Sequence, residues 1–387
     1  MKKIGILTFH RSINYGAYMQ CVALSRFISV MFPDYKVEVI DYESKKMHDI
    51  YVPKFALGYI KHPRVYFLTK KKYAAFLDAL KYLPLSDKYF CFDGMDEGLE
   101  KYINDNYDAV IIGSDAVWNW VKRGFPNFYL GGFGEKVKKF GYAASAYGME
   151  LDYVGEKETE YFGKALKEFS FIGYRDEYTK NLVKTVCPDA EPVFTCDPTL
   201  FLDMDYVLHL MGHSRKSFKD YIFEKYNLPK DKIIIGAMET SNEVIREVKK
   251  RYADKCYVVC VYNYLSTADK FIADLNPLEW SQIFSLFDIT ITNYFHGTLL
   301  SLKNNTPIIS IDRTAFSKRY EGKIHDVLRR MDLLDCYFTG ENSIEEIADK
   351  VAFVLENKAI YKQKIEKNLE ILAESRNRVV EAIKNVL

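Results

Sequence analysis

The chain has 387 residues, of which 48% are apolar, and its 54 basic and 53 acidic residues leave a formal net charge of +1. That length exceeds one ordinary hydrophobic core, so two domains are expected, and the balanced charge argues against a nucleic acid as the main partner. Seven cysteines, an odd number set mostly inside apolar runs, are typical of free thiols in a reducing compartment. Only Cys256 and Cys260 lie close together, without finger-like Cys or His spacing around them, so no metal is expected.

The first apolar run gives no targeting signal. It begins after Met1-Lys2-Lys3 and ends at His10-Arg11, too soon for a signal peptide, and no uninterrupted apolar stretch reaches the roughly 18 residues of a membrane span. We expect a cytoplasmic protein, either soluble or peripheral on the cytoplasmic face of the membrane.

Short apolar runs separated by helical spacing extend through both halves of the chain, which predicts parallel sheets. In the first half the expected strands are residues 4–9, 37–41, 109–112, 140–144, 169–174 and 193–196. In the second half they are residues 233–237, 256–262, 289–293 and 307–311, with helices expected over 241–251 and 277–287. The sequence therefore predicts an α/β protein with two Rossmann-like domains facing a cleft, an N-terminal one over residues 1–200 and a C-terminal one over residues 201–387.

Two segments depart from this alternation. Residues 51–83 contain no clear strand and are rich in Tyr, Phe and Lys, which favours a helical insertion in the first domain. Its basic runs at 61–64 and 70–72 are interpreted as a solvated helix face or as a dock for an anionic membrane surface or a lipid-linked acceptor. Residues 343–386 are an expected helical tail that returns to the first domain, and Ser343 with Glu346 forms a capping box at its start.

Polar and aromatic residues follow the first expected strand, where open parallel sheets bind ligands. His10, Asn14 and Tyr15 lie in this connection and are interpreted as acceptor-binding residues. A helix cap is an equally weighted alternative for Asn14.

The third expected strand ends in a similar group. Gly113 permits close backbone approach, and Ser114 and Asp115 follow at once, with Trp118 three positions further on. The polar pair is suited to sugar hydroxyls and the indole ring to the apolar face of a sugar. The alternative for Asp115 is a helix cap.

Arg175 follows the expected strand 169–174. A guanidinium at a strand end can bind two oxygens of a carboxylate or phosphate at once, so Arg175 is a candidate donor-binding residue. The alternative is a local pair with Asp176 that caps the next helix.

In the second half, the strand 289–293 runs into Phe295-His296-Gly297-Thr298 and then a helix. The amides of Gly297, Thr298 and Leu299 are expected to point from the helix start at a bound anion. His296 beside them can donate or accept a proton near neutral pH. The basic residues after the next strand are interpreted together as a phosphate clamp: Arg313, Lys318, Arg319 and Lys323.

Together these blocks resemble the polysaccharide pyruvyl transferase family. The matching residues occur in the family's order between about residues 4 and 325: Asn14-Tyr15-Gly16-Ala17 with Gln20, residues 107–119, Tyr142-Ala143-Ala144-Ser145, Arg175-Asp176, Asp197-Pro198-Thr199 and Phe295-His296-Gly297-Thr298. Each block alone is common, whereas six in register are specific. The resemblance implies a glycosyltransferase-B-like pair of domains, with the acceptor on the first and the donor on the second.

The resemblance also implies an activity. Members transfer the pyruvyl group of phosphoenolpyruvate to two hydroxyls of a sugar, which forms a cyclic ketal in a bacterial surface polysaccharide such as a capsule or exopolysaccharide. Phosphoenolpyruvate is then a co-substrate, and the reaction requires neither a cofactor nor a metal. By position, Arg175 and His296 match the donor-site arginine and histidine of the family, and Lys323 matches a family lysine, with Lys318 and Arg319 as alternative matches.

The glycan acceptor, lipid-linked or free, is not identified by the resemblance. Ala116-Val117 stand before Trp118 where the family often has glutamine, and residues 51–83 have no counterpart. Both regions are expected to face the acceptor.

The mechanism expected from these residues places phosphoenolpyruvate against the amides after His296, with Arg175 and Lys323 on its phosphate and carboxylate. His296 is the leading general acid and Asp115 a base for the attacking hydroxyl, although the two roles are exchangeable.

The alternative functions are a nucleotide-sugar-dependent glycosyltransferase on the same fold and a non-catalytic sugar- or anion-binding homologue. No G-x-G-x-x-G follows the first strand, and no Gly-Lys-Ser/Thr phosphate loop or Gly-x-Ser-x-Gly elbow occurs, which disfavours dinucleotide redox chemistry, nucleotide hydrolysis and serine nucleophiles.

Overall fold

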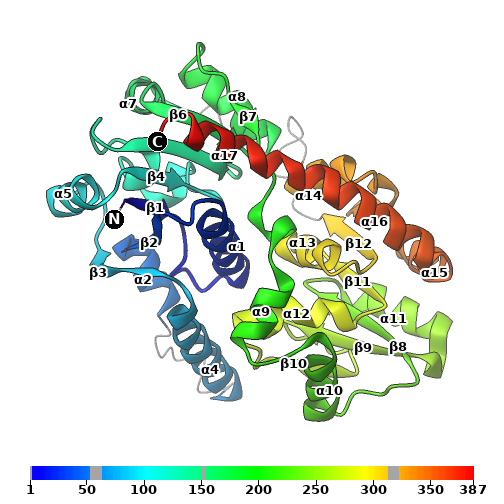
Figure 1. The fold of residues 1–387 in the computed structure, drawn as a ribbon. Coiled ribbons are helices and arrows are strands. Elements are labelled where there is room, and N and C mark those ends of the chain that lie inside the picture. The colour runs from blue at the N-terminus through cyan, green and yellow to red at the C-terminus, as the bar shows by residue number, and fades with distance from the viewer. Residues whose placement is uncertain (1, 53–62, 150–153, 313–321) are drawn as a thin grey trace. The chain divides into compact units, whose positions relative to one another are not determined.

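The computed structural model describes residues 2–52, 63–149, 154–312 and 322–387. The chain divides into two compact units (Figure 1). Unit 1 comprises Met1–Tyr66, Phe76–Leu202 and Glu374–Leu387, and unit 2 comprises Phe67–Ala75 and Asp203–Ala373.

Unit 1 is built on a parallel sheet with the order β3-β2-β1-β4-β5-β6-β7, seven strands within the described residues. Their bounds are β1 Lys3–Leu7, β2 Lys36–Glu43, β3 Leu85–Cys91, β4 Ala109–Ile112, β5 Lys138–Ala144, β6 Phe169–Tyr174 and β7 Val193–Phe194. The strand order reverses between β1 and β4. Open α/β sheets bind ligands beyond the carboxyl ends of the strands at such a reversal.

Helices connect these strands, as parallel pairing requires. They are α1 Tyr15–Met31, α2 Lys45–Tyr51, α4 Pro63–Ala79, α5 Glu97–Asn106, α6 Trp120–Arg123, α7 Glu156–Leu166, α8 Glu177–Val186 and α17 Asn377–Lys384. The middle of α4, residues 67–75, belongs to unit 2. The C-terminal segment belongs to unit 1, where Ser375 Oγ accepts from the Cys196 amide at 2.9 Å.

Unit 2 repeats the plan with a parallel sheet in the order β10-β9-β8-β11-β12-β13, and its order reverses between β8 and β11. The strands are β8 Ile233–Met238, β9 Cys256–Val261, β10 Lys270–Ile272, β11 Ile289–Thr292, β12 Ile308–Asp312 and β13 Tyr337–Thr339. The helices are α9 Met204–Leu210, α10 Arg215–Tyr226, α11 Asn242–Tyr252, α12 Pro277–Ile283, α13 Phe295–Lys303, α14 Lys323–Arg330, α15 Ile344–Glu356 and α16 Lys358–Ala373.

Side-chain caps start several of these helices where the sequence predicts a start. Ser343 Oγ accepts from the Glu346 amide at 3.1 Å and Glu346 Oε2 accepts from the Ser343 amide at 2.9 Å, which is the predicted capping box of α15. Ser241 caps α11 through one hydrogen bond, which its hydroxyl accepts from the Val244 amide. Such caps satisfy amide groups that have no acceptor inside the helix.

Three strands are absent from the sequence prediction: β3, β10 and β13. Strand β3 is an edge strand with Asp87-Lys88 at its centre, so it lacks the apolar run by which buried strands are found.

The expected helix over 277–287 is shorter, because α12 ends at Ile283 and a 3₁₀ turn follows over Phe284–Leu286. Within the expected insertion the described residues are helical, and Lys71 of its basic run pairs with Asp274 at 3.1 Å.

Candidate functional site

The strand-order reversal of unit 2 lies between β8 and β11, whose last residues, Met238 and Thr292, are partners in register. The connection after β11 leads directly into α13. Thr292 Oγ1 accepts from the Tyr294 amide at 2.9 Å and so fixes the turn at the strand end. The predicted sequence block 295–298 therefore stands where an open sheet binds its ligand.

His296 is the second residue of α13 and is 4% exposed. Its ring centroid lies 5.2 Å from that of Phe295 and 6.0 Å from that of Tyr294. The first amide groups of an α-helix have no acceptor within the helix, and the N-cap Tyr294 makes no side-chain cap hydrogen bond to them. The imidazole thus stands in the turn whose partial positive charge favours an anion.

Gly297 is required by packing. A Cβ there would lie 2.9 Å from Thr292 Oγ1 and 3.1 Å from Met238 Sδ, because the helix starts directly against the ends of β11 and β8. Such short contacts force a neighbour to move. The residue lets the first turn approach the strand ends closely.

Thr298 does not present its amide to a ligand as the sequence predicts. Its amide donates to Tyr294 O at 3.0 Å, and its buried hydroxyl lies 3.0 Å from Ser310 Oγ. The amide therefore belongs to the helix ladder and the hydroxyl to the contact with β12. The Thr298 amide is therefore not one of the amides at the helix start that lack an acceptor within the helix.

Three further residues gather at the same strand ends of unit 2 and were missed from the sequence. Glu239 follows β8, Tyr262 follows β9 with its ring stacked on Tyr294 at 5.2 Å, and Lys72 Nζ lies 3.6 Å from the Tyr262 ring centroid. Burial raises the pKa of Glu239, opposed by Lys72 and Lys323, and burial lowers the pKa of Lys72 to about 8, opposed by Glu239. Glu239 lies two positions after the predicted strand 233–237, and Tyr262 is the last residue of the predicted strand 256–262, so nearness to a strand end was a signal for both. Nothing local marked Lys72.

The expected phosphate clamp is described only in part. Lys323 is the first residue of α14, and its Nζ lies 4.7 Å from the Phe295 ring centroid, beside the first turn of α13. Arg313, Lys318 and Arg319 lie outside the described residues. Asp312, the last residue of β12, accepts from the Tyr337 hydroxyl at 3.2 Å.

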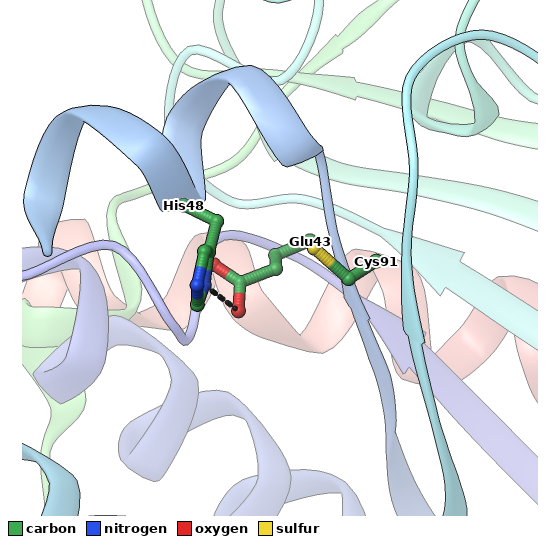
Figure 2. A group of neighbouring side chains, drawn as sticks. All are labelled: Glu43, His48 and Cys91. Carbon is green, nitrogen blue, oxygen red and sulfur yellow. Dashed lines mark hydrogen bonds and ion pairs between the residues drawn. The ribbon is translucent and has the colours of Figure 1, made fainter.

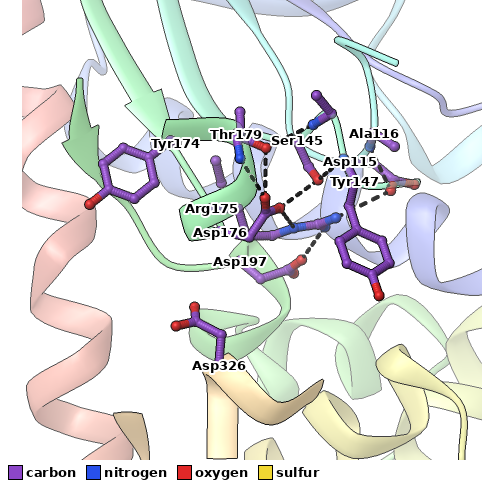
Figure 3. Close-up of polar contacts among 12 residues, drawn as sticks. Asp115, Ala116, Ser145, Tyr147, Tyr174, Arg175, Asp176, Thr179, Asp197 and Asp326 are labelled. Atoms are coloured by element: carbon purple, nitrogen blue, oxygen red, sulfur yellow. Dashed lines mark hydrogen bonds and ion pairs between the residues drawn. The ribbon is translucent and has the colours of Figure 1, made fainter. Parts of the chain in front are cut away.

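In unit 1, Arg175 lies within a cluster of carboxylates (Figure 3). Its Nη1 donates to Asp197 Oδ2 at 2.9 Å, and its Nη2 lies 3.7 Å from Asp115 Oδ1. Burial lowers the pKa of Arg175, but Asp197, Asp115 and Asp176 raise it and the net direction is upward. The guanidinium is therefore held charged, and its charge is already balanced by the protein's own carboxylates.

Asp176 fills the capping role that was the alternative for this segment. Its Oδ1 accepts from the Thr179 amide at 2.9 Å at the start of α8, and its Oδ2 accepts from Ser145 Oγ at 2.6 Å (Figure 3). Arg175 Nε lies 4.0 Å from Asp176, further than the contact with Asp197. Asp197 is thus the main partner of Arg175 and Asp176 a secondary one.

Asp115 stands at the end of β4, at the strand-order reversal of unit 1. Its backbone has a φ of 74°, a conformation uncommon outside glycine, and its Oδ1 accepts from the Ala116 amide at 2.8 Å. The cap of α6 is Asn119, so the helix-cap alternative for Asp115 is wrong. Its carboxylate is partly exposed and remains suited to proton transfer.

The neighbours of Asp115 lie deeper than expected. Trp118 is fully buried, its indole nitrogen donates to Tyr129 O at 3.1 Å, and its ring packs edge-on against Phe162. It is a core residue, so the expected sugar-stacking role is wrong. Ser114 is also buried, and its hydroxyl has no hydrogen-bond partner among the described residues.

The side chains of the residues after β1 also make their contacts within the protein. His10 is buried, with Nε2 at 2.9 Å from Asp41 Oδ1, and Tyr15 is buried with its ring stacked on Phe76. Asn14 caps α1 by accepting from the Gly16 amide at 3.0 Å, which bears out the cap alternative. Acceptor contacts from buried His10 and Tyr15 would require these side chains to move.

The fold defines the class of protein: two α/β units on parallel sheets form a glycosyltransferase-B-like fold. The chain matches a UDP-GlcNAc 2-epimerase from Neisseria meningitidis bound to UDP-GlcNAc with a TM-score of 0.61 at 9% identity, over 100% of both chains. It matches S. aureus MnaA in a co-structure with UDP (TM-score 0.54, 13% identity, 100% of this chain and 96% of that chain) and a UDP-GlcNAc 2-epimerase from Methanocaldococcus jannaschii (0.53, 11%, 92% and 93%). At these identities the likeness establishes the fold alone.

The particular family follows from the sequence profile described as polysaccharide pyruvyl transferase, which matches residues 14–314. The chain belongs to the polysaccharide pyruvyl transferase family, and membership indicates a transferase. None of the curated proteins compared with the chain matches it. Within the described ranges, no helix has both the length and the apolar character needed to cross a membrane.

Proposed function

We propose that the protein transfers the pyruvyl group of phosphoenolpyruvate to two hydroxyls of a sugar in a bacterial surface polysaccharide, with the donor held at the start of α13. The observation that carries this proposal is the position of His296. It lies in the first turn of α13, at the strand-order reversal of unit 2 and inside the region matched by the family.

The chemistry of the donor suits that turn. Phosphoenolpyruvate carries a phosphate and a carboxylate, and a helix start offers outward amides and a partial positive charge to one of them. Lys323 lies beside the same turn through its contact with the Phe295 ring. Its ammonium group then serves the second anionic group, and Lys72 adds a further positive charge at the same strand ends.

Ketal formation needs two proton transfers in addition to bond changes at carbon. Two C–O bonds form at C2 of phosphoenolpyruvate, and the bond from C2 to the phosphate oxygen breaks. The two hydroxyl protons lost by the sugar are balanced by one on the methylene carbon, which becomes a methyl group, and one on the departing phosphate. His296 acts as the general acid, and Glu239, whose pKa burial raises, is the second candidate at the same strand ends.

In unit 1, Asp115 is assigned the role of base toward the acceptor hydroxyl. It is the partly exposed carboxylate of the Arg175 cluster, whereas Asp176 and Asp197 are buried and occupied by Thr179, Ser145, Arg175 and Gln20. Arg175 keeps its proposed donor-binding role, and its contacts give it a second one in positioning Asp115 and Asp197.

The direct test is incubation of the purified protein with phosphoenolpyruvate and a panel of free and lipid-linked oligosaccharides. Phosphate release that depends on an acceptor, with a matching mass gain on that acceptor, is the expected result. Sugar transfer from a nucleotide sugar instead would favour the glycosyltransferase alternative. Binding of phosphoenolpyruvate without turnover on any acceptor would favour a non-catalytic homologue.

A further inference from the structure

A second group of reactive side chains lies in unit 1, at the carboxyl ends of β2 and β3 and away from the Arg175 cluster in the sequence. Glu43, His48 and Cys91 each direct a possible metal-ligand atom to one place, and these atoms all lie within 4.8 Å of one another (Figure 2). His48 Nδ1 is 3.1 Å from Glu43 Oε1. Among the seven cysteines, all of which the structure describes, Cys91 alone is not buried.

Backbone geometry holds these three residues together. Glu43 and Cys91 are the last residues of neighbouring parallel strands and are partners in register. Ser44 caps α2 immediately after Glu43, and the His48 amide donates to Ser44 O at 3.0 Å, which brings His48 back over the strand end. The Lys46 amide also donates to Asp93 Oδ1 at 3.1 Å, which ties α2 to the segment after β3.

The donor set selects a class of ion. A thiolate, an imidazole and a carboxylate are the ligands of zinc and related divalent transition metals, whereas magnesium and calcium prefer oxygen alone. Bond lengths of about 2.0–2.3 Å at tetrahedral angles place such ligand atoms roughly 3.3–3.8 Å apart. The observed spacing needs only a small closure by side-chain rotation.

The surroundings also fit a cation. Tyr89 donates to Glu43 Oε1 at 2.6 Å, the kind of outer hydrogen bond that orients a metal-binding carboxylate. Arg11 lies over the Tyr89 ring at 4.4 Å, and it donates to Asp41 Oδ1 at 2.5 Å and to Asp41 Oδ2 at 2.7 Å. Its charge is therefore largely balanced by Asp41.

We propose that Glu43, His48 and Cys91 bind one divalent transition-metal ion, with zinc as the best match, and that a water molecule completes the coordination. The ion has a structural role, because it connects α2 to the ends of β2 and β3, and it takes no part in the transfer reaction. A sequence search misses the site because its ligands are 5 and 43 positions apart and share no finger-like spacing. The proposal differs from the expectation, drawn from Cys256 and Cys260, that the chain binds no metal.

Titration of the chelator-treated, full-length protein with Co²⁺ and with Zn²⁺ tests the proposal. One equivalent of Co²⁺ is expected to produce an intense sulfur-to-cobalt charge-transfer absorption, and one equivalent of Zn²⁺ to abolish it and raise Tm. Cys91→Ser should remove the absorption, and Cys91→Ser or His48→Gln should weaken zinc binding more than about 100-fold, since loss of an outer partner alone costs 10–100-fold. Tyr89→Phe should fall in that smaller range.

The matched controls are Cys256→Ala and His213→Gln, which remove a thiol and an imidazole elsewhere. Both should bind zinc as the wild type does. The proposal is overturned if the wild type binds no equivalent of Co²⁺ or Zn²⁺, if Cys91→Ser keeps the sulfur-to-cobalt absorption, or if Cys256→Ala loses it. Circular dichroism of each metal-free variant shows that a loss of binding is not a loss of fold.

Discussion

Arg175 and Asp197 form a buried ion pair, with Nη1 and Oδ2 separated by 2.9 Å. The pair connects the end of β6 to the 3₁₀ turn Pro198–Phe201, and Gln20 of α1 donates to the same carboxylate oxygen. Three segments that the family resemblance picks out are thus joined by one carboxylate. Arg175, which the sequence alone assigned to a ligand, therefore also holds the loops of unit 1 in place.

Arg175→Ala should destabilise the protein strongly. It leaves buried carboxylates without their cation, a change that costs about 3–5 kcal/mol of unfolding free energy. Arg175→Lys keeps the charge but loses the two-pronged geometry, so its loss should be smaller. Urea unfolding of both variants measures this, and an alanine variant within about 1 kcal/mol of the wild type would contradict a structural role for the pair.

Gly297→Ala should lower stability by about 1–3 kcal/mol, because its methyl group would enter the space of Thr292 and Met238. Gly340→Ala is the matched control, since an added Cβ there meets nothing within 4 Å. Thermal unfolding of the two variants compares the sites directly. Equal Tm values for both would show that α13 can move away from the strand ends without cost.

Asp41 should make stability depend on acid pH. Burial raises the pKa of its carboxyl, but hydrogen bonds from Arg11 and His10 lower the pKa by more than burial raises it. The folded pKa therefore lies below the ordinary 3.8. A lowered folded pKa contributes stability above pH 3.8 that is lost as pH falls through the folded value. Asp41→Asn should cost about 1–3 kcal/mol at neutral pH.

Urea unfolding of the wild type and of Asp41→Asn at several pH values tests the direction of this pH dependence. The free-energy difference between the wild type and Asp41→Asn should shrink as pH falls below 3.8, whereas Asp78→Asn, which breaks an exposed pair with Lys81, should change little at any pH. A difference that grows toward acid pH would refute the assignment.

Asp115→Asn should reduce acceptor-dependent phosphate release by about 10²–10⁴-fold, the range for loss of a positioned base. The partly exposed amide is nearly isosteric, so Tm should change little. Asp105→Asn removes an exposed carboxylate on α5 and serves as the control. Full activity in Asp115→Asn would assign the base to another residue.

The sequence was a good guide to the sheets and a poorer guide to which strand-end residues face a ligand. Buried strands such as β4 and β11 are short apolar runs, so their positions were predicted to within a residue or two. Edge strand β3 was missed because its charged residues face solvent. Whether a side chain is buried depends on neighbours that the fold brings together and the sequence does not show. For this reason Trp118, His10 and Thr298 were predicted to be site residues, although their side chains are buried inside the protein.

Dependence on the fold also explains why the prediction from the sequence did not include some residues of the two candidate sites. Tyr262 and Glu239 lie at strand ends that were predicted, and only the sheet order shows that these ends are adjacent to β11 or one strand away. Lys72 and His48 come from helices that no local pattern links to a strand end. Long-range placement of this kind depends on the topology of the whole sheet.

Calorimetric titration of phosphoenolpyruvate into the wild type, His296→Ala and the control His209→Ala tests the central claim most directly. The account predicts binding to the wild type and to His209→Ala, and an affinity for His296→Ala lower by about tenfold or more, a loss of roughly 1.4 kcal/mol or more. Acceptor-dependent phosphate release should be lost in His296→Ala while its Tm is kept. Unchanged affinity and turnover in His296→Ala would contradict a donor site at the start of α13.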